Sequence, residues 1–295
     1  MQQRFPGAWA GKAGVQLDRR RKVILLSRVP YAQVVLLVVL MVSVTDRGWL
    51  PSSSVRASTR TARQEAPLLR VVTYNVHSCK GLDSRVRPDR IADILRHTDA
   101  DVIALQEVRA GQAAEIARQI QFNLAFAQAD IVHGYEFGNA ILTRYPMRET
   151  HVYPLGVPGR QQRACLRADI AWPRDDQLIH VFTVHLGLSK DERREQASRL
   201  ASGAILLDPN LQHVPRLLLG DFNEKAGNGA VNQQLSPLLR RVGRKTWPSI
   251  LPLVGLDRLY LSSELKVRSV HVFRSPGALI ASDHIPLTAI LEIER

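Results

Sequence analysis

Two polar side chains close a strongly apolar run, and their spacing could place them in one chemical site. The run LLLGDFN covers residues 217–223 and includes Asp221 and Asn223 near its end. Successive strand residues point to opposite faces, so residues two positions apart share a face. A carboxylate beside a carboxamide suits a polar site on a rigid strand, although both residue types are also common in turns. The rest of the chain must decide between a site and a turn.

Other polar residues also lie at the ends of apolar runs. Asn75, Glu107 and His185 follow such runs, whereas Asp257, Asp283 and His284 precede them. Each residue alone has an ordinary explanation as a turn residue, a surface charge or a buried histidine. Together they favour one shared site, because burying an unpaired polar group costs roughly 1–3 kcal/mol. A sheet rim is also a rigid place to hold functional groups.

The chemical content of this set indicates a divalent cation and a phosphate group. Oxygen donors on Asn75, Glu107 and Asp283 suit Mg²⁺ or Mn²⁺. Two histidines and the remaining carboxylates are then available for proton transfer and for phosphate contact. The sequence contains no HExxH, GxSxG or Walker motif. Zinc-protease, α/β-hydrolase and P-loop functions therefore lack support.

Apolar patterning predicts alternating strands and helices, which is typical of an α/β domain. We expect strands at 68–75, 101–105, 138–142, 148–154, 163–172, 178–185, 216–219, 256–261, 267–273 and 287–293. We expect helices at 88–97, 111–121, 191–207 and 230–240, from apolar residues three and four positions apart and from flanking helix signals. Val-rich strands without polar alternation indicate sheets that are buried on both faces.

Seven short motifs, in this order, resemble the endonuclease/exonuclease/phosphatase superfamily, which has the deoxyribonuclease I-like fold. They are TYNV (73–76), LQEV (105–108), GNAIL (138–142), VHL (184–186), GDFN (220–223), LDRLY (256–260) and SDHIP (282–286). The resemblance extends over residues 68–293. It implies a four-layer α/β sandwich of two stacked mixed β-sheets flanked by helices, with the active site at one rim.

The resemblance also implies roles for the residues around a metal ion. Glu107 would be the main ligand of Mg²⁺ or Mn²⁺, with Asn75 nearby and Asp283 as a further ligand. His284 would be the general base or would stabilise charge on the attacked phosphate. Asp257 would orient that histidine, because a carboxylate fixes the tautomer of an imidazole and supports its protonated form.

The remaining residues implied by the resemblance contact water and the substrate phosphate. Asp221 and Asn223 would position the water and hold the phosphate, and Asp221 stays an alternative to the histidine as general base. His185 would donate to a phosphoryl oxygen. Asn139 and Arg163 are candidate contacts of the substrate phosphate, although Arg163 could also be an ordinary surface arginine.

The first 66 residues differ in composition from the rest of the chain. Residues 1–28 form a basic N-terminal region, and residues 29–44 form an uncharged apolar segment. This pattern predicts an apolar helix that acts as a signal or membrane anchor, so the protein would be membrane-anchored or exported with an extracytoplasmic catalytic domain. The segment has 16 residues, fewer than the ~20 of a usual spanning helix, and a buried core helix is the alternative. Residues 45–66 are predicted to be a flexible linker, which leaves residues 67–295 as the domain.

The positive charge is concentrated outside the predicted domain. Residues 1–66 carry 11 Lys and Arg against three acidic residues, a charge of +8, which leaves +5 of the chain's +13 for residues 67–295. Only 33 residues separate Asn223 from Asp257, which leaves little room for inserted DNA-binding loops. Both observations weaken the inference of a dedicated nuclease that the total charge would favour.

Three functions remain open at this point. The first is a divalent-metal-dependent phosphodiester hydrolase or nuclease, and the second is a membrane-proximal phosphoesterase of phospholipid or inositol-phosphate headgroups. The third is a non-catalytic binding module, which the complete set of polar residues argues against. The expected partners are a phosphate-ester substrate and, through residues 29–44, a membrane, and we expect a monomer. Two cysteines, Cys79 and Cys165, are too few for a disulfide framework, and their pairing stays open.

Overall fold

The computed structural model describes residues 68–173, 177–211, 213–225 and 227–294. The predicted basic region, apolar helix and linker of residues 1–66 therefore lie outside the described residues. Among the residues that are described, no helix is both long enough and apolar enough to cross a membrane.

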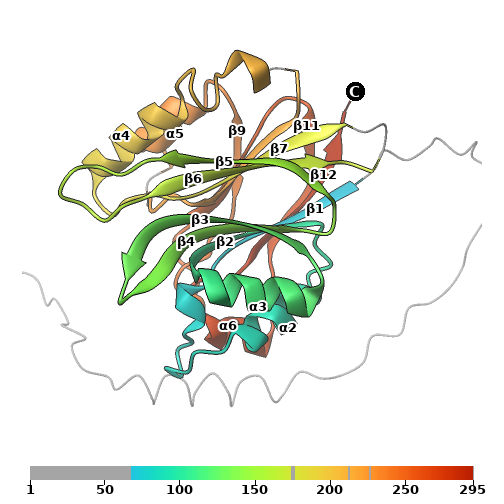
Figure 1. Ribbon diagram of the computed structural model, residues 1–295, viewed down its shortest axis with the longest axis vertical. Helices are drawn as coiled ribbons and strands as arrows, with labels where there is room; N and C mark the ends of the chain where they lie inside the picture. Colours follow the sequence, from blue (N-terminus) through green and yellow to red (C-terminus); the bar gives the residue numbers. More distant parts are fainter. Residues whose placement is uncertain (1–67, 174–176, 212, 226, 295) are drawn as a thin grey trace, which may run out of the picture. The chain divides into compact units, whose positions relative to one another are not determined.

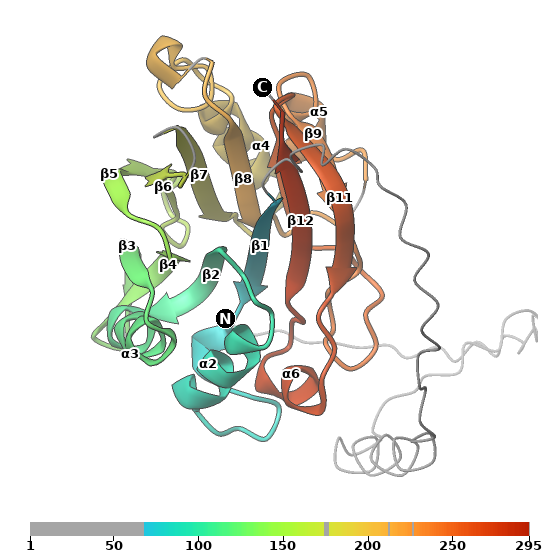
Figure 2. The ribbon, with the colours of Figure 1, turned by 90° about the vertical axis from the view of Figure 1, so that its right-hand side faces the viewer.

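The described chain folds into two mixed β-sheets of six strands each. The first sheet contains β1 (Leu68–Asn75), β2 (Val102–Arg109), β3 (Asn123–Val132), β4 (Tyr135–Thr143), β11 (Leu265–Val272) and β12 (Leu287–Ile293). Its order is β11-β12-β1-β2-β4-β3, and Figure 2 shows β12 between β1 and β11. The second sheet contains β5 (Met147–Pro154), β6 (Ala164–Ala171), β7 (Leu178–His185), β8 (Arg216–Asp221), β9 (Arg240–Gly243) and β10 (Asp257–Leu261). Its order is β5-β6-β7-β8-β10-β9.

Helices cover the outer face of each sheet, so the domain has four layers. Helices α2 (Pro88–Arg96), α3 (Ala110–Ile120) and α6 (Pro276–Ala281) lie on the first sheet, and α4 (Lys190–Leu200) and α5 (Ala230–Leu235) lie on the second. Two 3-10 turns, His77–Cys79 and Pro209–Leu211, complete the elements. Figure 1 shows the order helices, sheet, sheet, helices. The predicted four-layer α/β sandwich is confirmed.

Three apolar clusters fill the spaces between these layers. Ile141 and Leu219 belong to the cluster between the two sheets. Ile91 and Ile116 belong to the cluster between the first sheet and its helices, and Phe182 to the cluster between the second sheet and its helices. All five side chains are fully buried. The strands are thus apolar on both faces, which explains why their sequences show little polar alternation.

Strand register places the predicted polar residues side by side. Strands β1 and β2 are parallel, and Asn75 pairs with Gln106 next to the end of β2. Strands β7 and β8 are also parallel, and His185 pairs with Asp221. In the antiparallel pair of β8 and β10, Asp221 pairs in turn with Asp257. Residues far apart in the sequence therefore meet at one rim because the strands that carry them are neighbours.

Gly220 is required for the close approach of β7 and β8 at this rim. Its φ of +151° lies outside the range that other residues adopt readily. A Cβ atom at this position would lie 2.0 Å from the carbonyl oxygen of Val184. Any side chain here would force the two strands apart immediately before His185 and Asp221.

Several expected elements differ from the structure. The helix expected at 191–207 ends at Leu200, where Ser202 and Gly203 follow it. Strands β3 and β9 and helix α6 were not predicted. β9 and α6 are shorter than the patterns that sequence periodicity detects, and β3 is a half-exposed edge strand. Cys79 and Cys165 are both free and buried, in different apolar clusters.

A buried ionic network joins β6 to β7. The carboxylate of Asp169 accepts hydrogen bonds from Nε and Nη2 of Arg167, both at 2.9 Å, and contacts Nδ1 of His180 at 2.7 Å. Burial would raise the pKa of Asp169, but the hydrogen bonds from His180 and Arg167 outweigh burial and lower it. The network therefore requires the ionised carboxylate.

We expect Asp169→Asn to destabilise the domain by about 3–5 kcal/mol, because it leaves the buried Arg167 without its closest counter-charge. Urea unfolding would measure the loss at pH 7. The native pKa of Asp169 lies below the unfolded value of ~3.9, so its contribution is present above that pH and lost as pH falls. The gap between wild type and variant should therefore shrink in acid. Glu149→Gln, at an exposed carboxylate 3.9 Å from Arg167, is the control and should cost less than about 1 kcal/mol.

Candidate active site

One pocket of about 350 Å³ opens at the rim where the polar strand ends meet. Seven of the ten predicted site residues line it, namely Glu107, Arg163, His185, Asp221, Asn223, Asp283 and His284. The other three, Asn75, Asn139 and Asp257, are buried and do not line it. Glu107 and His284, which are 177 positions apart in the sequence, therefore open onto the same cavity.

Asp257 holds His284 from behind. Oδ2 of Asp257 lies 2.8 Å from Nδ1 of His284 and also accepts a hydrogen bond from the hydroxyl of Thr246. The Asp257 side chain is fully buried, and His284 and Thr246 are the hydrogen-bond partners of its Oδ2. With Nδ1 engaged, Nε2 of His284 faces Asp221, whose Oδ2 lies 3.7 Å away. Asp257 thus fixes which ring nitrogen of His284 is available at the pocket.

Carboxylates control the protonation of His284. Burial alone would lower its pKa, but the charges of Asp257, Asp221 and Asp283 outweigh burial. Together they raise the pKa of His284 to about 10. The raised pKa favours the protonated ring, which presents an N–H at Nε2.

His185 has the opposite electrostatic environment. Burial and the nearby charge of Arg163 lower its pKa to about 3, against the opposing effect of Asp221. Nη1 of Arg163 lies 2.9 Å from Nδ1 of His185. Because a guanidinium can only donate, Nδ1 must accept and Nε2 must carry the proton. His185 therefore presents a neutral N–H, with its Nε2 3.7 Å from Oε1 of Glu107 and 3.8 Å from Oδ2 of Asp221.

Asn223 competes with Arg163 for the same imidazole. Its Nδ2 lies 3.0 Å from Nε2 of His185 and donates to the carbonyl of Leu186 at 2.9 Å. A neutral imidazole cannot accept a hydrogen bond at both ring nitrogens. The short His185–Asn223 approach is therefore not a hydrogen bond to the imidazole, and the Leu186 carbonyl is the acceptor for the Asn223 amide.

Glu107 projects from a β-bulge. The register between β2 and β4 shifts between Leu105 and Val108, and Glu107 has a left-handed φ of +53°. Bulges re-aim side chains next to functional sites, at a cost in backbone strain. The result is a carboxylate directed into the pocket from a strand whose residues Val102 to Gln106 are all buried.

Asn75 links two of the carboxylates. Its Nδ2 donates to Oε1 of Glu107 and to Oδ2 of Asp221, both at 3.0 Å. Its Oδ1 accepts from the backbone N–H of His77. The amide thus turns its nitrogen toward the carboxylates, and a role as metal ligand would require it to turn over. Asp283 lines the same pocket, and its carboxylate accepts a hydrogen bond from Nε1 of Trp247 at 3.4 Å.

The donor set fits a hard divalent cation. Glu107 and Asp283 offer partly exposed carboxylates on one pocket, and Asp221 adds a buried one. The pocket lining contains no cysteine, and oxygen-rich sites of this type favour Mg²⁺ or Mn²⁺. A tighter group of Asp221, Asp257 and His284, whose ligand atoms lie within 4.8 Å of one another, is already joined in part by the His284–Asp257 hydrogen bond.

Two buried amides tie the sheets together behind the pocket. Nδ2 of Asn139 donates to the carbonyl of Ala164 at 2.9 Å, and Nε2 of Gln106 donates to the hydroxyl of Thr183 at 3.0 Å. Both bonds join a strand of the first sheet to a strand of the second. Asn139, a predicted phosphate contact, is thus used between the sheets, away from the pocket lining.

Sequence reasoning missed several residues of this site. Thr246 and Trp247, which hold Asp257 and Asp283, lie in a loop without any motif. Lys225 and Leu188 also line the pocket. Lys225 lies two positions after Asn223, and Leu188 lies three positions after His185. Their closeness to predicted residues was the only available signal.

Comparisons with known proteins agree with this fold. The profile described as "Endonuclease/Exonuclease/phosphatase family" matches residues 72–284. The protein YbhP of Escherichia coli K12 is 28% identical over 248 residues, covering 76% of this chain and 96% of its own length. The mannosyl-6-phosphatase of Bacteroides thetaiotaomicron is 20% identical, with a TM-score of 0.63 and coverage of 76% and 99%. D. rerio TDP2 complexed with a single-strand DNA product is 18% identical, with a TM-score of 0.62 and coverage of 76% and 99%. The two solved structures establish likeness of fold.

Proposed function

Because this chain belongs to the endonuclease/exonuclease/phosphatase family, whose members hydrolyse phosphate esters, we propose that it is a divalent-metal-dependent phosphodiester hydrolase. The observation that carries the proposal is the convergence of Glu107, His185 and His284 on one pocket. These groups offer a cation-binding carboxylate and two N–H donors to the same small volume. Such an arrangement suits a tetrahedral anion better than a neutral substrate.

Each side chain has a definite task in this proposal. Glu107 and Asp283 would hold Mg²⁺ or Mn²⁺, joined by Asn75 if its amide turns. The bound cation would neutralise charge on the phosphate. His185 and His284 would donate from Nε2 to phosphate oxygens, and these donors are already fixed by Arg163 and Asp257 before any substrate arrives.

Asp221 and Asn223 are the groups available to position the attacking water. Asp221 lies between the two histidines, with its Oδ2 3.8 Å from Nε2 of His185 and 3.7 Å from Nε2 of His284. The side chain is buried and rigidly held by the hydrogen bond from Asn75. Asp221 and Asn223 would orient the attacking water, and an oriented water reacts far faster than a freely diffusing one.

A substrate panel tests the reaction class. The full-length protein would be incubated with Mg²⁺, Mn²⁺ or EDTA on plasmid DNA, RNA, sphingomyelin, a phosphatidyl ester and inositol phosphates. We expect hydrolysis of at least one ester with a metal ion and none with EDTA, because the carboxylate-rich pocket needs a cation to accept an anion. The His284→Ala variant, purified in the same way, controls for contaminating hydrolases.

The pattern across the panel separates the remaining functions. Hydrolysis of lipid esters without hydrolysis of nucleic acid would reject the nuclease hypothesis and support a membrane-proximal phosphoesterase. The exposed Leu188 at the pocket mouth would then contact the lipid. Tight binding of one compound without turnover of any would show a binding module and reject the proposal.

A further inference from the structure

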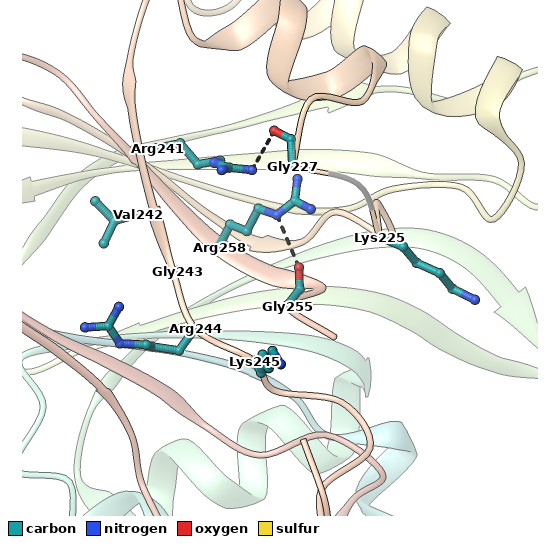
Figure 3. Close-up of a pocket in the computed structure, with 9 residues that line it drawn as sticks. All are labelled: Lys225, Gly227, Arg241, Val242, Gly243, Arg244, Lys245, Gly255 and Arg258. Carbon is teal, nitrogen blue, oxygen red and sulfur yellow. Dashed lines mark hydrogen bonds between the residues drawn. The ribbon is translucent and has the colours of Figure 1, made fainter. Parts of the chain in front are cut away.

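A second, strongly basic pocket adjoins the candidate active site. It has a volume of about 690 Å³ and is lined by Lys225, Gly227, Arg241, Val242, Gly243, Arg244, Lys245, Gly255 and Arg258. Figure 3 shows these residues around the end of β9 and the start of β10. Its lining contains five cations, three glycines and one valine, with no acidic and no aromatic side chain. Lys225 lines both this pocket and the candidate active site, so the two cavities are neighbours.

Internal contacts use two of the five cations. Arg258 is buried and pairs with Glu224, with Nη1 and Oε2 3.1 Å apart. Arg241 donates to the carbonyl of Gly227 at 2.8 Å, a neutral partner that leaves its charge uncompensated. Figure 3 shows the Arg241–Gly227 contact and a further hydrogen bond from Nε of Arg258 to the Gly255 carbonyl.

The other three cations have no acidic partner among the described residues. Lys225, Arg244 and Lys245 are all exposed, and no ion pair or hydrogen bond holds their side chains there. In Figure 3, Lys225 extends away from Arg241 and Arg258. Exposed charges on an edge strand such as β9 protect it from pairing with other strands. Edge protection does not explain Arg244 and Lys245, which follow the strand, or Lys225, which follows β8.

The backbone brings these cations to the active site by close packing. A Cβ on Gly255 would lie 2.7 Å from the carbonyl oxygen of Arg244, so only glycine allows the two segments to approach this closely. The residues that follow the basic segment are Thr246, which holds Asp257, and Trp247, which lines the active-site pocket. Arg244 and Lys245 therefore directly precede two residues that support the candidate active site.

We propose that this basic pocket binds a second phosphate group of the same substrate molecule whose ester is hydrolysed in the neighbouring pocket. Uncompensated lysine and arginine side chains recognise phosphate, and the absence of an aromatic lining leaves no platform for stacking a base. The pocket therefore recognises phosphate and not base identity. The inference rests on the proposed function and narrows its substrate to esters that carry at least two phosphates, from a polynucleotide or a small polyphosphorylated molecule.

A matched substrate pair tests this inference. The p-nitrophenyl ester of thymidine 5′-phosphate has one phosphate, and the same ester with an added 3′-phosphate has two. For the wild type, we expect the added phosphate to lower KM about tenfold or more with little change in kcat. In the Arg244→Gln/Lys245→Gln double variant, KM should become nearly equal for both esters, while turnover of the single-phosphate ester is retained. Raised salt should also remove the difference.

The experiment includes a control variant and a comparison of two substrates that could supply the second phosphate. Lys266→Gln/Arg268→Gln removes two exposed charges from β11, outside both pockets, and should leave the KM difference intact. A twelve-nucleotide oligothymidylate is compared with the small bisphosphate ester. The affinity that the Arg244→Gln/Lys245→Gln variant (the basic-pocket variant) loses relative to wild type is measured for both compounds. A larger loss for the oligonucleotide identifies a nucleic-acid strand as the source of the second phosphate. Equal losses for the two compounds identify a small molecule.

Binding without turnover separates this inference from the proposed function. Titration calorimetry would follow inorganic tripolyphosphate binding to wild type and to the basic-pocket variant in EDTA. We expect the variant to bind at least tenfold more weakly. Hydrolysis of both esters with equal KM in the wild type would overturn the second-phosphate inference and leave the hydrolase intact. Unchanged tripolyphosphate binding in the variant would overturn it as well, whether or not any ester is turned over.

Discussion

Replacing His284 with alanine should reduce turnover by ~10²–10⁴-fold, the range typical of a residue that exchanges or donates a proton in the reaction. His284 presents Nε2 at the pocket, and its other nitrogen is held by Asp257 at 2.8 Å. Alanine removes the N–H donor and leaves no other group in its place. The measurement is the initial rate on the best substrate of the panel, at saturating metal ion. Full activity in the variant would remove His284 from the mechanism.

Folding must be measured alongside this rate. His284→Ala leaves the fully buried Asp257 with the Thr246 hydroxyl as its remaining side-chain donor. Removing one partner of a buried charge pair destabilises a protein by about 3–5 kcal/mol. Rates are therefore referred to folded protein, determined by circular dichroism. His284→Gln, which keeps a polar side chain at this position, provides a second variant that should fold better and remain slow.

A double-mutant cycle identifies the role of Asp257. If this carboxylate acts by orienting His284, Asp257→Asn should slow the wild type but add little to His284→Ala. Independent, additive losses in the double variant would show that Asp257 acts on the substrate or cation directly. The pocket geometry favours the first result, because Asp257 is fully buried and does not line the pocket.

Replacing Glu107 with glutamine should weaken cation binding by at least ~100-fold and reduce turnover at limiting metal ion accordingly. Glu107 offers a partly exposed carboxylate to the pocket, and glutamine keeps its size while removing its charge. The change should be nearly neutral for stability, since the Asn75 amide can still hydrogen-bond to the glutamine oxygen. The expected loss is therefore one of charge and not of structure.

Metal binding can be read directly for this variant. Calorimetric titration of Mn²⁺ into metal-free protein should give a clear signal for the wild type and a much weaker one for Glu107→Gln. Excess Mn²⁺ should recover part of the lost turnover, because the remaining carboxylates still line the site. Glu136→Gln, at an exposed glutamate on β4, is the matched control and should bind Mn²⁺ normally. Equal Mn²⁺ affinity in both variants would exclude Glu107 as a ligand.

The sequence determined the fold class because its strands are long, apolar and separated by turn residues. The predicted strands at 68–75, 178–185 and 287–293 have the observed bounds. Strand β3 was not predicted, because it is a half-exposed edge strand with a weak hydrophobic pattern. The expected helix at 191–207 was too long, since apolar spacing continued beyond the point where Ser202 and Gly203 break the helix. Local pattern therefore predicts buried elements best.

The candidate site residues could also be chosen from the sequence, but their arrangement could not. Glu107, Asp221 and His284 could be chosen as polar residues beside apolar runs. The pairing of Arg163 with His185 could not, because it depends on the register of β6 with β7 and on a loop of unrecognisable pattern. The same holds for Thr246 and its bond to Asp257.

The sequence alone thus determined which residues could bind a cation and a phosphate, because residue type fixes which groups can ligate, donate or accept. Only the tertiary structure decided how these residues are arranged. The bulge at Glu107 and the guanidinium beside His185 result from contacts between distant segments. The gathering of cations next to the active site arises in the same way, through the close approach of Gly255 to the backbone of Arg244. Such contacts depend on strand register and side-chain packing, and neither leaves a local pattern in the chain.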